Sequence, residues 1–239
     1  MSGHSKWSTI KRKKGAADAK RGVIFTRLSK DITLAAKEGG GNSDMNPALR
    51  LAIKKAKTSN MPAANIEKAI KKGTGDLPGV KYEDCLYEAY GPSSVAILIQ
   101  VMTDNKNRTL PEIKSILTKN GGNLGSSGCV SWIFEKKGIF SINTSKIDEE
   151  RILDILDDFD IIDFDLVDEN FEITSSADTF GDISIKLESE NIEFDGEISL
   201  VPQNTVKVSS ESADKIVRLL EIIENHDDVQ KVHTNFEIE

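Results

Sequence analysis

The residues best suited to chemistry in this chain are cations, and they are concentrated in its first third. Residues 1–75 hold 17 Lys and Arg against 5 Asp and Glu, whereas residues 76–239 hold 14 basic and 34 acidic residues. The formal net charge of the whole chain, −8, conceals this segregation. Lysine places a point charge on a phosphate oxygen, and arginine can fork across two oxygens. The segregation therefore predicts a polyanionic partner for residues 1–75.

Apolar periodicity predicts that three helices carry these cations, at 18–38, at 47–59 and from Pro62 onward, with Gly73 as the residue just beyond the end of the third. The first helix is expected to bury a stripe around Leu28 and Ile32 and to turn Lys30 to the opposite face. In the other two helices, cations also recur at helical spacing on one face. The sequence thus predicts a small bundle with a positive outer surface.

Residues 1–17 form a basic arm that is expected to become ordered only on binding. We predict that the arm and the helices contact nucleic-acid phosphates, so that affinity falls steeply with salt. The predicted contact residues are Lys6, Lys11, Arg12, Lys13, Lys14, Lys20, Arg21, Arg27, Arg50, Lys54, Lys57, Lys68, Lys71 and Lys72. Trp7 is a candidate for stacking on a base, although anchoring of the arm to the helical bundle is the favoured role. An alternative is that the basic module docks on the chain's own acidic body.

The sequence contains few residues suited to catalysis or to binding a metal or cofactor. The chain has three His, and its two Cys, Cys85 and Cys129, stand far apart in no ligand pattern. The glycine-rich stretches 39–41 and 121–128 match neither a phosphate loop nor a dinucleotide fingerprint, although the second could offer backbone N–H groups to an anion. We therefore predict no catalytic residue, no metal, no cofactor and no enzyme activity.

An acidic run from Asp148 to Glu172 holds twelve carboxylates and one base, Arg151. Without a calcium-loop pattern it is interpreted as a solvated surface, with a basic protein as a possible partner. The N-terminal residues lack the apolar stretch of a secretory signal, and the longest apolar run, 95–101, is far short of the roughly 20 residues of a membrane span. We expect a cytoplasmic protein with no membrane partner, which suits its unpaired cysteines.

Beyond a predicted linker at 74–81, strands and helices alternate. The expected elements are strands 82–89 and 94–102, helix 107–119 and strand 128–134, then strand 139–142, helix 148–159, strands 161–167 and 171–175, helix 178–190 and strand 193–200. The second series has the βαββαβ order of a ferredoxin-like unit. Residues 204–239, a strand, a helix and a strand, cannot bury their own faces and are expected to pair with 82–134.

The predicted fold class is accordingly α+β, with an N-terminal three-helix domain followed by an α+β domain that an inserted ferredoxin-like domain interrupts. The predicted domains are a basic helical nucleic-acid-binding domain at 1–75, a discontinuous α+β domain at 82–134 plus 204–239, and an inserted acidic domain at 135–203.

The chain resembles the YebC/PmpR family, which is related to the mitochondrial translational activators. The resemblance runs nearly end to end, on GHSKW (3–7), IKRKKGAADAKRG (10–22), AAKEGGG (35–41), NPALRLAI (46–53), NIEKAIKKGTG (65–75), TDNKNRT (103–109) and DDVQKVHTN (227–235), among others. It implies a three-domain cytoplasmic protein and a DNA-binding transcriptional regulator. One departure is Ser93-Ser94, where the family usually has glycines.

Three functional hypotheses follow. The first is a non-enzymatic DNA-binding transcriptional regulatory protein that contacts phosphates through its basic N-terminal domain. The second is a ribosome- or RNA-associated translation factor, because phosphates of DNA and RNA look alike to a lysine. The third is an interaction module whose acidic body binds a basic partner.

Overall fold

The computed structural model of the protein describes residues 21–77 and 83–239. The described chain divides into two compact units, one made of residues 32–74 and 136–200 and the other of residues 21–31, 75–135 and 201–239. The fold is α+β, as the sequence predicted. The predicted three-domain boundaries remain a prediction.

None of the helices in the described ranges combines the length and the apolar character that a membrane crossing requires.

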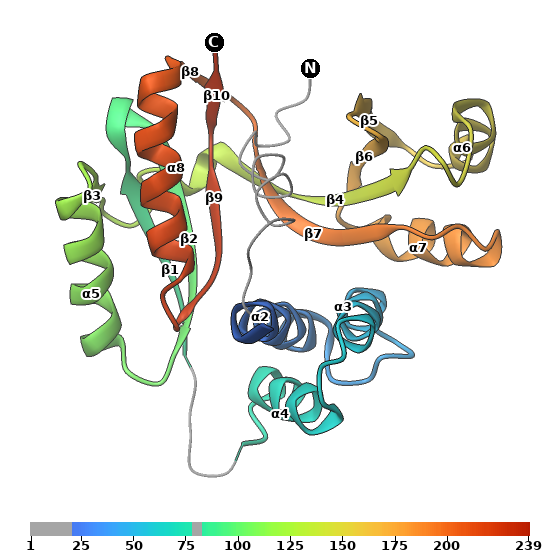
Figure 1. Ribbon diagram of the computed structural model, residues 1–239, viewed down its shortest axis with the longest axis horizontal. Coiled ribbons are helices and arrows are strands. Elements are labelled where there is room, and N and C mark those ends of the chain that lie inside the picture. The colour runs from blue at the N-terminus through green and yellow to red at the C-terminus, as the bar shows by residue number, and fades with distance from the viewer. Residues whose placement is uncertain (1–20, 78–82) are drawn as a thin grey trace. The chain divides into compact units, whose positions relative to one another are not determined.

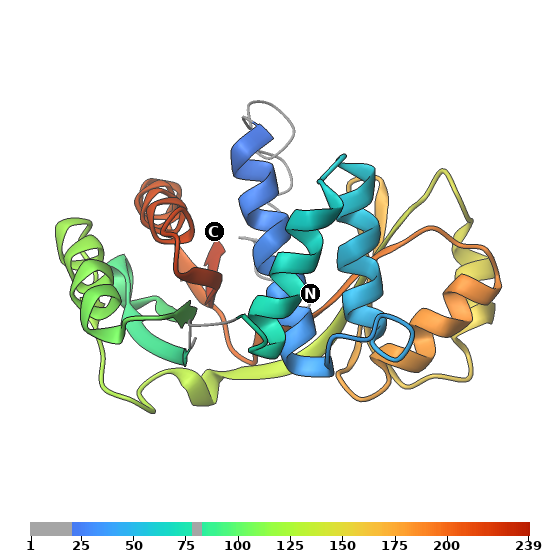
Figure 2. The ribbon, with the colours of Figure 1, turned by 90° about the horizontal axis from the view of Figure 1, so that it is seen from below.

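Three helices occupy the N-terminal part, α2 (Arg21–Gly39), α3 (Pro47–Thr58) and α4 (Ala63–Thr74), and they pack together in Figures 1 and 2. Asn46 caps α3, because its side-chain oxygen accepts from the Leu49 N–H at 3.0 Å. Ile32 and Leu49 are completely buried, as the periodicity indicated. Narrow, alanine-rich faces such as these let short helices approach closely and leave their outer faces to polar residues.

The third helix runs further than predicted, because Gly73 lies inside it and not beyond its end. Helix α4 ends at Thr74, and Gly75, at φ +80°, adopts the left-handed conformation beyond its end. A Cβ at Gly73 would collide with the Thr33 carbonyl oxygen and lie 2.9 Å from the Ala36 Cβ. This glycine therefore serves close packing of α4 on α2, a role that helix-end signals in the sequence cannot reveal.

The first unit also contains the predicted βαββαβ series. Its elements are β4 (Phe134–Asn143), α6 (Glu149–Leu156), β5 (Ile161–Val167), β6 (Asn170–Ser176), α7 (Phe180–Ser189) and β7 (Asp195–Pro202). The strands lie in the order β5-β6-β4-β7, and β6 is antiparallel to both β4 and β5. Phe140, Ile152 and Ile173 are fully buried in its core.

Helix α3 contributes one residue to that core. Leu51 is buried in the cluster that includes Phe140 and Phe180, and α3 contacts α7 (Figure 2). Apolar periodicity alone predicts a core stripe of Leu49, Ala52, Ile53 and Ala56 for this helix, which leaves Leu51 out. A single-face interpretation misses it because α3 packs on α4 with one face and on the ferredoxin-like elements with another.

The second unit is built on a sheet of order β3-β1-β2-β9. Its elements are β1 (Glu83–Tyr90), η1 (Pro92–Ser94), β2 (Ala96–Thr103), α5 (Lys106–Lys119), β3 (Asn123–Leu124), η2 (Ser131–Ile133), β8 (Val206–Val208), α8 (Ser210–Glu224), β9 (Val229–Thr234) and β10 (Phe236–Ile238). Strand β9 is antiparallel to β2, with Ile97 opposite Thr234 and Ile99 opposite Val232. Two segments far apart in the chain therefore share one sheet, as the sequence predicted.

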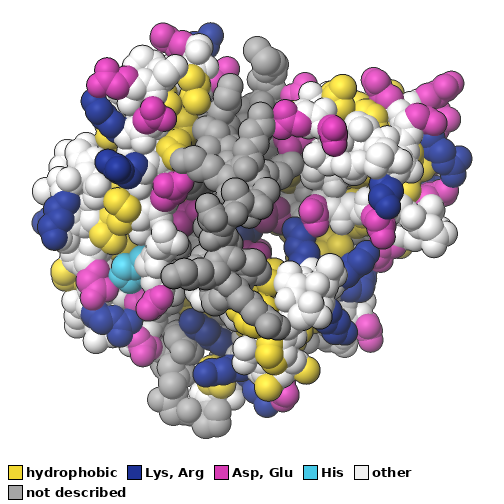
Figure 3. Space-filling view, in the orientation of Figure 1, with side chains coloured by type: hydrophobic (Ala, Val, Ile, Leu, Met, Phe, Trp, Pro, Cys, Tyr) yellow, Lys and Arg dark blue, Asp and Glu magenta, His cyan; other side chains and the backbone are white. Residues whose placement is uncertain are grey.

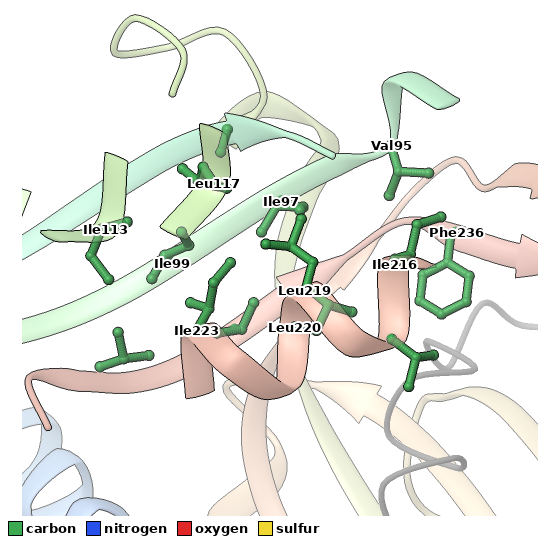
Figure 4. Packing of buried hydrophobic residues seen from close by; sticks show 14 of the residues in the cluster. Val95, Ile97, Ile99, Ile113, Leu117, Ile216, Leu219, Leu220, Ile223 and Phe236 are labelled. Carbon is green, nitrogen blue, oxygen red and sulfur yellow. The ribbon is translucent and has the colours of Figure 1, made fainter. Parts of the chain in front are cut away.

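Helices α5 and α8 cover one face of this sheet (Figure 1). In Figure 4, Ile113 and Leu117 of α5 meet Leu219 and Ile223 of α8 over Ile99 of β2, and all five are fully buried. Burial of so many aliphatic side chains stabilises this unit at roughly 25 cal/mol per Å² of apolar surface removed from water.

The strand predicted at 128–134 is wrong in most of its length. Residues Ser131–Ile133 form the short 3₁₀ helix η2, and the strand β4 begins only at Phe134. The N–H groups of Gly128, Val130 and Ser131 are bonded to the Glu88 carboxylate and are therefore not available for strand pairing. The apolar residues Val130 and Ile133 favour a strand in the sequence. In the structure, hydrogen bonds to the buried Glu88 carboxylate fix the backbone here in another conformation.

Candidate nucleic-acid interface

Three lysines on α3 and α4 present exposed amino groups, namely Lys54, Lys57 and Lys68, which we call the basic helical surface. No other described residue hydrogen-bonds or ion-pairs with these amino groups. Lys54 and Lys57 are three residues apart on α3 and so lie on one side of that helix. Figure 3 shows Lys and Arg side chains over the region of α3 and α4. This surface can bind an anion without first breaking an internal contact.

Two further predicted contact residues of α4, Lys71 and Lys72, are less available to a partner than Lys68. Lys71 lies 2.7 Å from the Glu67 carboxylate one turn earlier, and this hydrogen bond and charge lower the pKa of Glu67. Lys72 is half-buried. Exposed pairs of this kind contribute little to stability, so a phosphate can compete for Lys71 at small cost.

Arg50 is held in a forked ion pair. Its Nε lies 3.2 Å from Glu188 Oε1 and its Nη2 lies 3.1 Å from Glu188 Oε2, while Nη1 donates to the Ser43 carbonyl at 3.2 Å. Lys55 likewise lies 3.2 Å from Asp195. Within the first unit, two cations of α3 are thus paired with carboxylates of the ferredoxin-like elements. This agrees in part with the alternative that basic residues dock on the acidic body.

Lys30, which the sequence placed on the outer face of its helix, is buried. Its Nζ donates to the backbone carbonyls of Glu224 at 3.2 Å and His226 at 2.9 Å, at the C-terminal end of α8. The negative end of a helix favours a cation there. The prediction was wrong because helical periodicity gives the direction of a side chain but not the element that covers it.

Several predicted contact residues cannot be placed. Lys6, Lys11, Arg12, Lys13, Lys14 and Lys20 lie outside the described residues, as do the predicted arm with Trp7 and residues 78–81 of the predicted linker. The side chains of Arg21 and Arg27 also lie outside the description. Their role remains a prediction. Of the fourteen, the structure therefore places six side chains, at positions 50, 54, 57, 68, 71 and 72.

The acidic run forms a separate part of the first unit's surface. Figure 3 shows acidic side chains gathered around α6 and β5, away from α3 and α4. Asp148 caps α6 through its side chain, and Glu149 and Glu150 occupy the first turn, where the helix dipole favours carboxylates. These placements give several members of the run an ordinary structural reason.

The glycine-rich stretch 121–128 is expected to offer N–H groups to an anion, and the anion is Glu88 of the protein itself. Glu88 is only 5% exposed, and its carboxylate accepts from Gly128 N and Val130 N at 2.6 Å and from Ser131 N at 2.7 Å. Burial raises the pKa of Glu88, but the three backbone N–H groups outweigh it and the pKa is lowered. These three N–H groups, one from the glycine-rich stretch and two just beyond it, are therefore already bound to an internal anion.

Two family models cover almost the whole chain. The model described as TACO1/YebC protein N-terminal domain matches residues 5–76, and the one described as TACO1/YebC second and third domain matches residues 82–236. The chain belongs to the TACO1/YebC family. The resemblance seen in the sequence motifs is confirmed.

Relatives in this family match the full length of the chain. A protein of Dictyoglomus turgidum is 48% identical over 240 residues, covering 100% of this chain and 96% of its own length, and one of Leptospira biflexa is 50% identical, covering 100% and 97%. Both are named probable transcriptional regulatory protein. The crystal structure of a conserved hypothetical protein from Aquifex aeolicus has a TM-score of 0.84 at 40% identity and covers 98% of each chain. The fold is therefore that of the family.

Proposed function

We propose that this protein is a non-enzymatic regulator that binds nucleic acid through phosphate contacts of its N-terminal helices. The basic helical surface carries the proposal, because its three amino groups are exposed and unpaired within the described chain. The names of the relatives, probable transcriptional regulatory protein, support a role in transcription and therefore DNA as the first candidate partner.

A phosphate bound here would cost the protein little. The amino groups of Lys54, Lys57 and Lys68 have no bond to another described residue to break, and these side chains are exposed to water. Binding would release counterions from the nucleic acid, which supplies a favourable and salt-sensitive free energy. The phosphate contacts position the partner and carry no sequence information themselves.

RNA is the second candidate, and the engagement of Arg50 favours it. Arginine is the side chain that most often reads guanine in the DNA major groove, and Arg50 is committed to Glu188. The remaining described cations of α3 and α4 are lysines, which fit the backbone of either nucleic acid. A ribosomal or messenger RNA partner would make this protein a translation factor.

The test replaces the three lysines with glutamine together, as Lys54→Gln, Lys57→Gln and Lys68→Gln. Each lost phosphate contact should make the log–log dependence of affinity on salt shallower by about 1. We expect a wild-type slope steeper than about −3 and a variant slope about 2 to 3 less steep. Binding of labelled duplex DNA and of structured RNA is measured by anisotropy between low and physiological salt.

The matched control removes the same charge elsewhere, through Lys207→Gln, Lys215→Gln and Arg218→Gln, all exposed residues of β8 and α8. The control should keep the wild-type slope. If both variants bind alike, the basic helical surface is not the site, and a wild-type protein with a flat salt response contradicts the whole proposal. Sedimentation from lysate then separates the candidates, since co-migration with ribosomal subunits after DNase treatment favours translation and recovery of a defined DNA fragment favours transcription.

A further inference from the structure

Two aromatic side chains of the second unit meet at one backbone carbonyl. Trp132, in η2, is 66% exposed, and Tyr90, at the end of β1, is 38% exposed. Trp132 Nε1 and Tyr90 Oη each donate to the Cys129 carbonyl oxygen at 3.1 Å. Their polar atoms are thus satisfied inside the protein, and what remains for a partner is the apolar surface of the two rings.

The loop that holds these rings is firmly built. Beside the three N–H bonds to the Glu88 carboxylate, Gly125 N donates to the Glu88 carbonyl at 2.7 Å. A Cβ at Gly125 would collide with Cys129 Sγ, and one at Gly122 would lie 2.9 Å from the Tyr90 carbonyl oxygen. Exposed aromatic surface on such a rigid loop needs no ordering when a partner binds, which lowers the entropic cost of association.

The charge of this loop differs from that of the surrounding body. Residues 120–133, from the end of α5 through η2, contain no Asp, Glu, Lys or Arg, within a part of the chain that holds 34 carboxylates in residues 76–239. The loop residues Asn123, Ser126 and Ser127 are exposed and neutral. Glu88, whose carboxylate accepts from the loop N–H groups, is buried. A polyanion can therefore approach the rings without meeting exposed carboxylates of the loop.

We propose that Tyr90 and Trp132 form a stacking platform for an unpaired base of the bound nucleic acid, an inference that rests on the proposed function. An aromatic face accepts any base, and the uncharged loop lets a phosphate chain approach the rings without charge repulsion from the loop itself. Bases inside a duplex are stacked on one another and do not offer their faces. The platform therefore selects single-stranded segments, whereas the basic helical surface accepts any phosphate backbone.

Tryptophan fluorescence tests this directly. The chain has two tryptophans, so a full-length Trp7→Phe protein reports on Trp132 alone. We expect twelve-nucleotide oligo(dT) and oligo(U) to quench its emission on binding, and a twelve-base-pair duplex to bind without quenching it. Comparison of the two oligonucleotides shows whether DNA or RNA fits better.

Affinity provides the second measurement. Trp132→Ala should weaken single-strand binding by about 10- to 100-fold, the range that loss of one stacked base produces, and should change duplex binding less than 2-fold. Trp132→Phe should retain most of the affinity because it keeps a ring. The matched control is Ile185→Ala, which shortens another exposed apolar side chain, 55% exposed on α7, and should leave both affinities unchanged.

Other outcomes overturn the inference. If single strands bind with a salt-dependent affinity that the lysine variant reduces, but Trp132 is neither quenched nor needed, the platform is wrong and the proposed function stands. If neither single strands nor duplexes bind, both fail. A Trp132 emission that shifts to the blue with rising protein concentration alone would mean that a second copy of the chain covers the rings.

Discussion

The basic helical surface differs from the loop of residues 120–133, whose N–H groups bind the Glu88 carboxylate, in how charge is used. Lys54, Lys57 and Lys68 are exposed to water and their amino groups have no partner among residues 21–77 and 83–239, whereas Glu88 is buried and bonded to three backbone N–H groups. The first arrangement leaves a charge ready for a partner outside the molecule. The second uses a charge to shape the backbone, and it places two aromatic rings where they can be reached.

The difference shows that residue type alone does not distinguish a binding charge from a structural one. Both regions are rich in signals that resemble anion binding, cations in one and glycines in the other. In the loop, the bound anion is the protein's own Glu88 carboxylate. In the helices, the anion would be a phosphate of a partner. Replacing a residue should therefore change stability in the loop and binding in the helices.

The largest stability effect is expected for Glu88→Gln. A carboxamide has one acceptor oxygen and sets an NH₂ group against at least one of the three N–H donors, so the variant should lose about 2–4 kcal/mol of unfolding free energy. Urea unfolding followed by circular dichroism measures it. The control Glu211→Gln removes an exposed carboxylate of α8 that pairs only with Lys215 and should leave the midpoint nearly unchanged.

The same pair of proteins should respond differently to acid. Because the folded pKa of Glu88 lies below its ordinary value of 4.5, its stabilisation is complete above that value and is lost as pH falls through the folded pKa. The stability gap between wild type and Glu88→Gln should narrow as pH is lowered from about 5 to 3. A gap that stays constant over this range would contradict the assignment of the bonds to the ionised carboxylate.

A smaller effect is expected when two lysines are compared. Lys30→Met keeps the length of the side chain but removes the donor from the carbonyls of Glu224 and His226, and should cost about 1–3 kcal/mol. Lys54→Met removes an exposed charge with no internal partner and should change stability by less than about 0.5 kcal/mol. Thermal unfolding of the two variants distinguishes them, and equal losses would show that Lys30 is not a structural cation.

The smallest effect is expected in the turn between β1 and β2. Ser93 and Ser94 both have positive φ, at 60° and 58°, a conformation that glycine adopts without steric cost. These are the two positions where the family usually has glycine. Ser93→Gly or Ser94→Gly should raise stability by up to about 1 kcal/mol, the relief of strain being offset in part by the freer unfolded chain.

Ser115→Gly in the middle of α5 is the control for the turn. There the backbone is helical, and glycine should lower stability by about 0.5–1 kcal/mol. A loss of stability in the turn variants as well would show that the left-handed backbone is not strained, and a differential scanning experiment resolves the sign.

Much of the fold could be predicted from the sequence because apolar periodicity reports local structure directly. The βαββαβ order and the pairing of β2 with β9 followed from strands that could not bury their faces alone. The 3₁₀ helix η2 could not be predicted, because its cause is the side chain of Glu88 more than forty residues away.

Motifs far apart also acquire meaning only when they meet. Arg108 lies in the TDNKNRT motif and Asp228 in DDVQKVHTN, and Arg108 Nη2 lies 2.7 Å from Asp228 Oδ2, which also accepts from Thr103 and Thr109. Burial raises the pKa of Asp228, yet the bonds from Thr109, Arg108 and Thr103 lower it further than burial raises it. These motifs therefore join the two segments of the discontinuous sheet, which neither motif shows by itself.

The sequence by itself determined the segregation of charge, the helical and strand periods and the family motifs, because these depend only on residue type and spacing. The tertiary structure decided which charges remain available. Of the cations that helical spacing placed on outer faces, Lys54, Lys57 and Lys68 stay exposed, Arg50 pairs with Glu188 and Lys30 is buried at the end of α8. The physical reason is that periodicity gives the side of a helix on which a side chain lies, whereas long-range packing determines whether water or another element meets it.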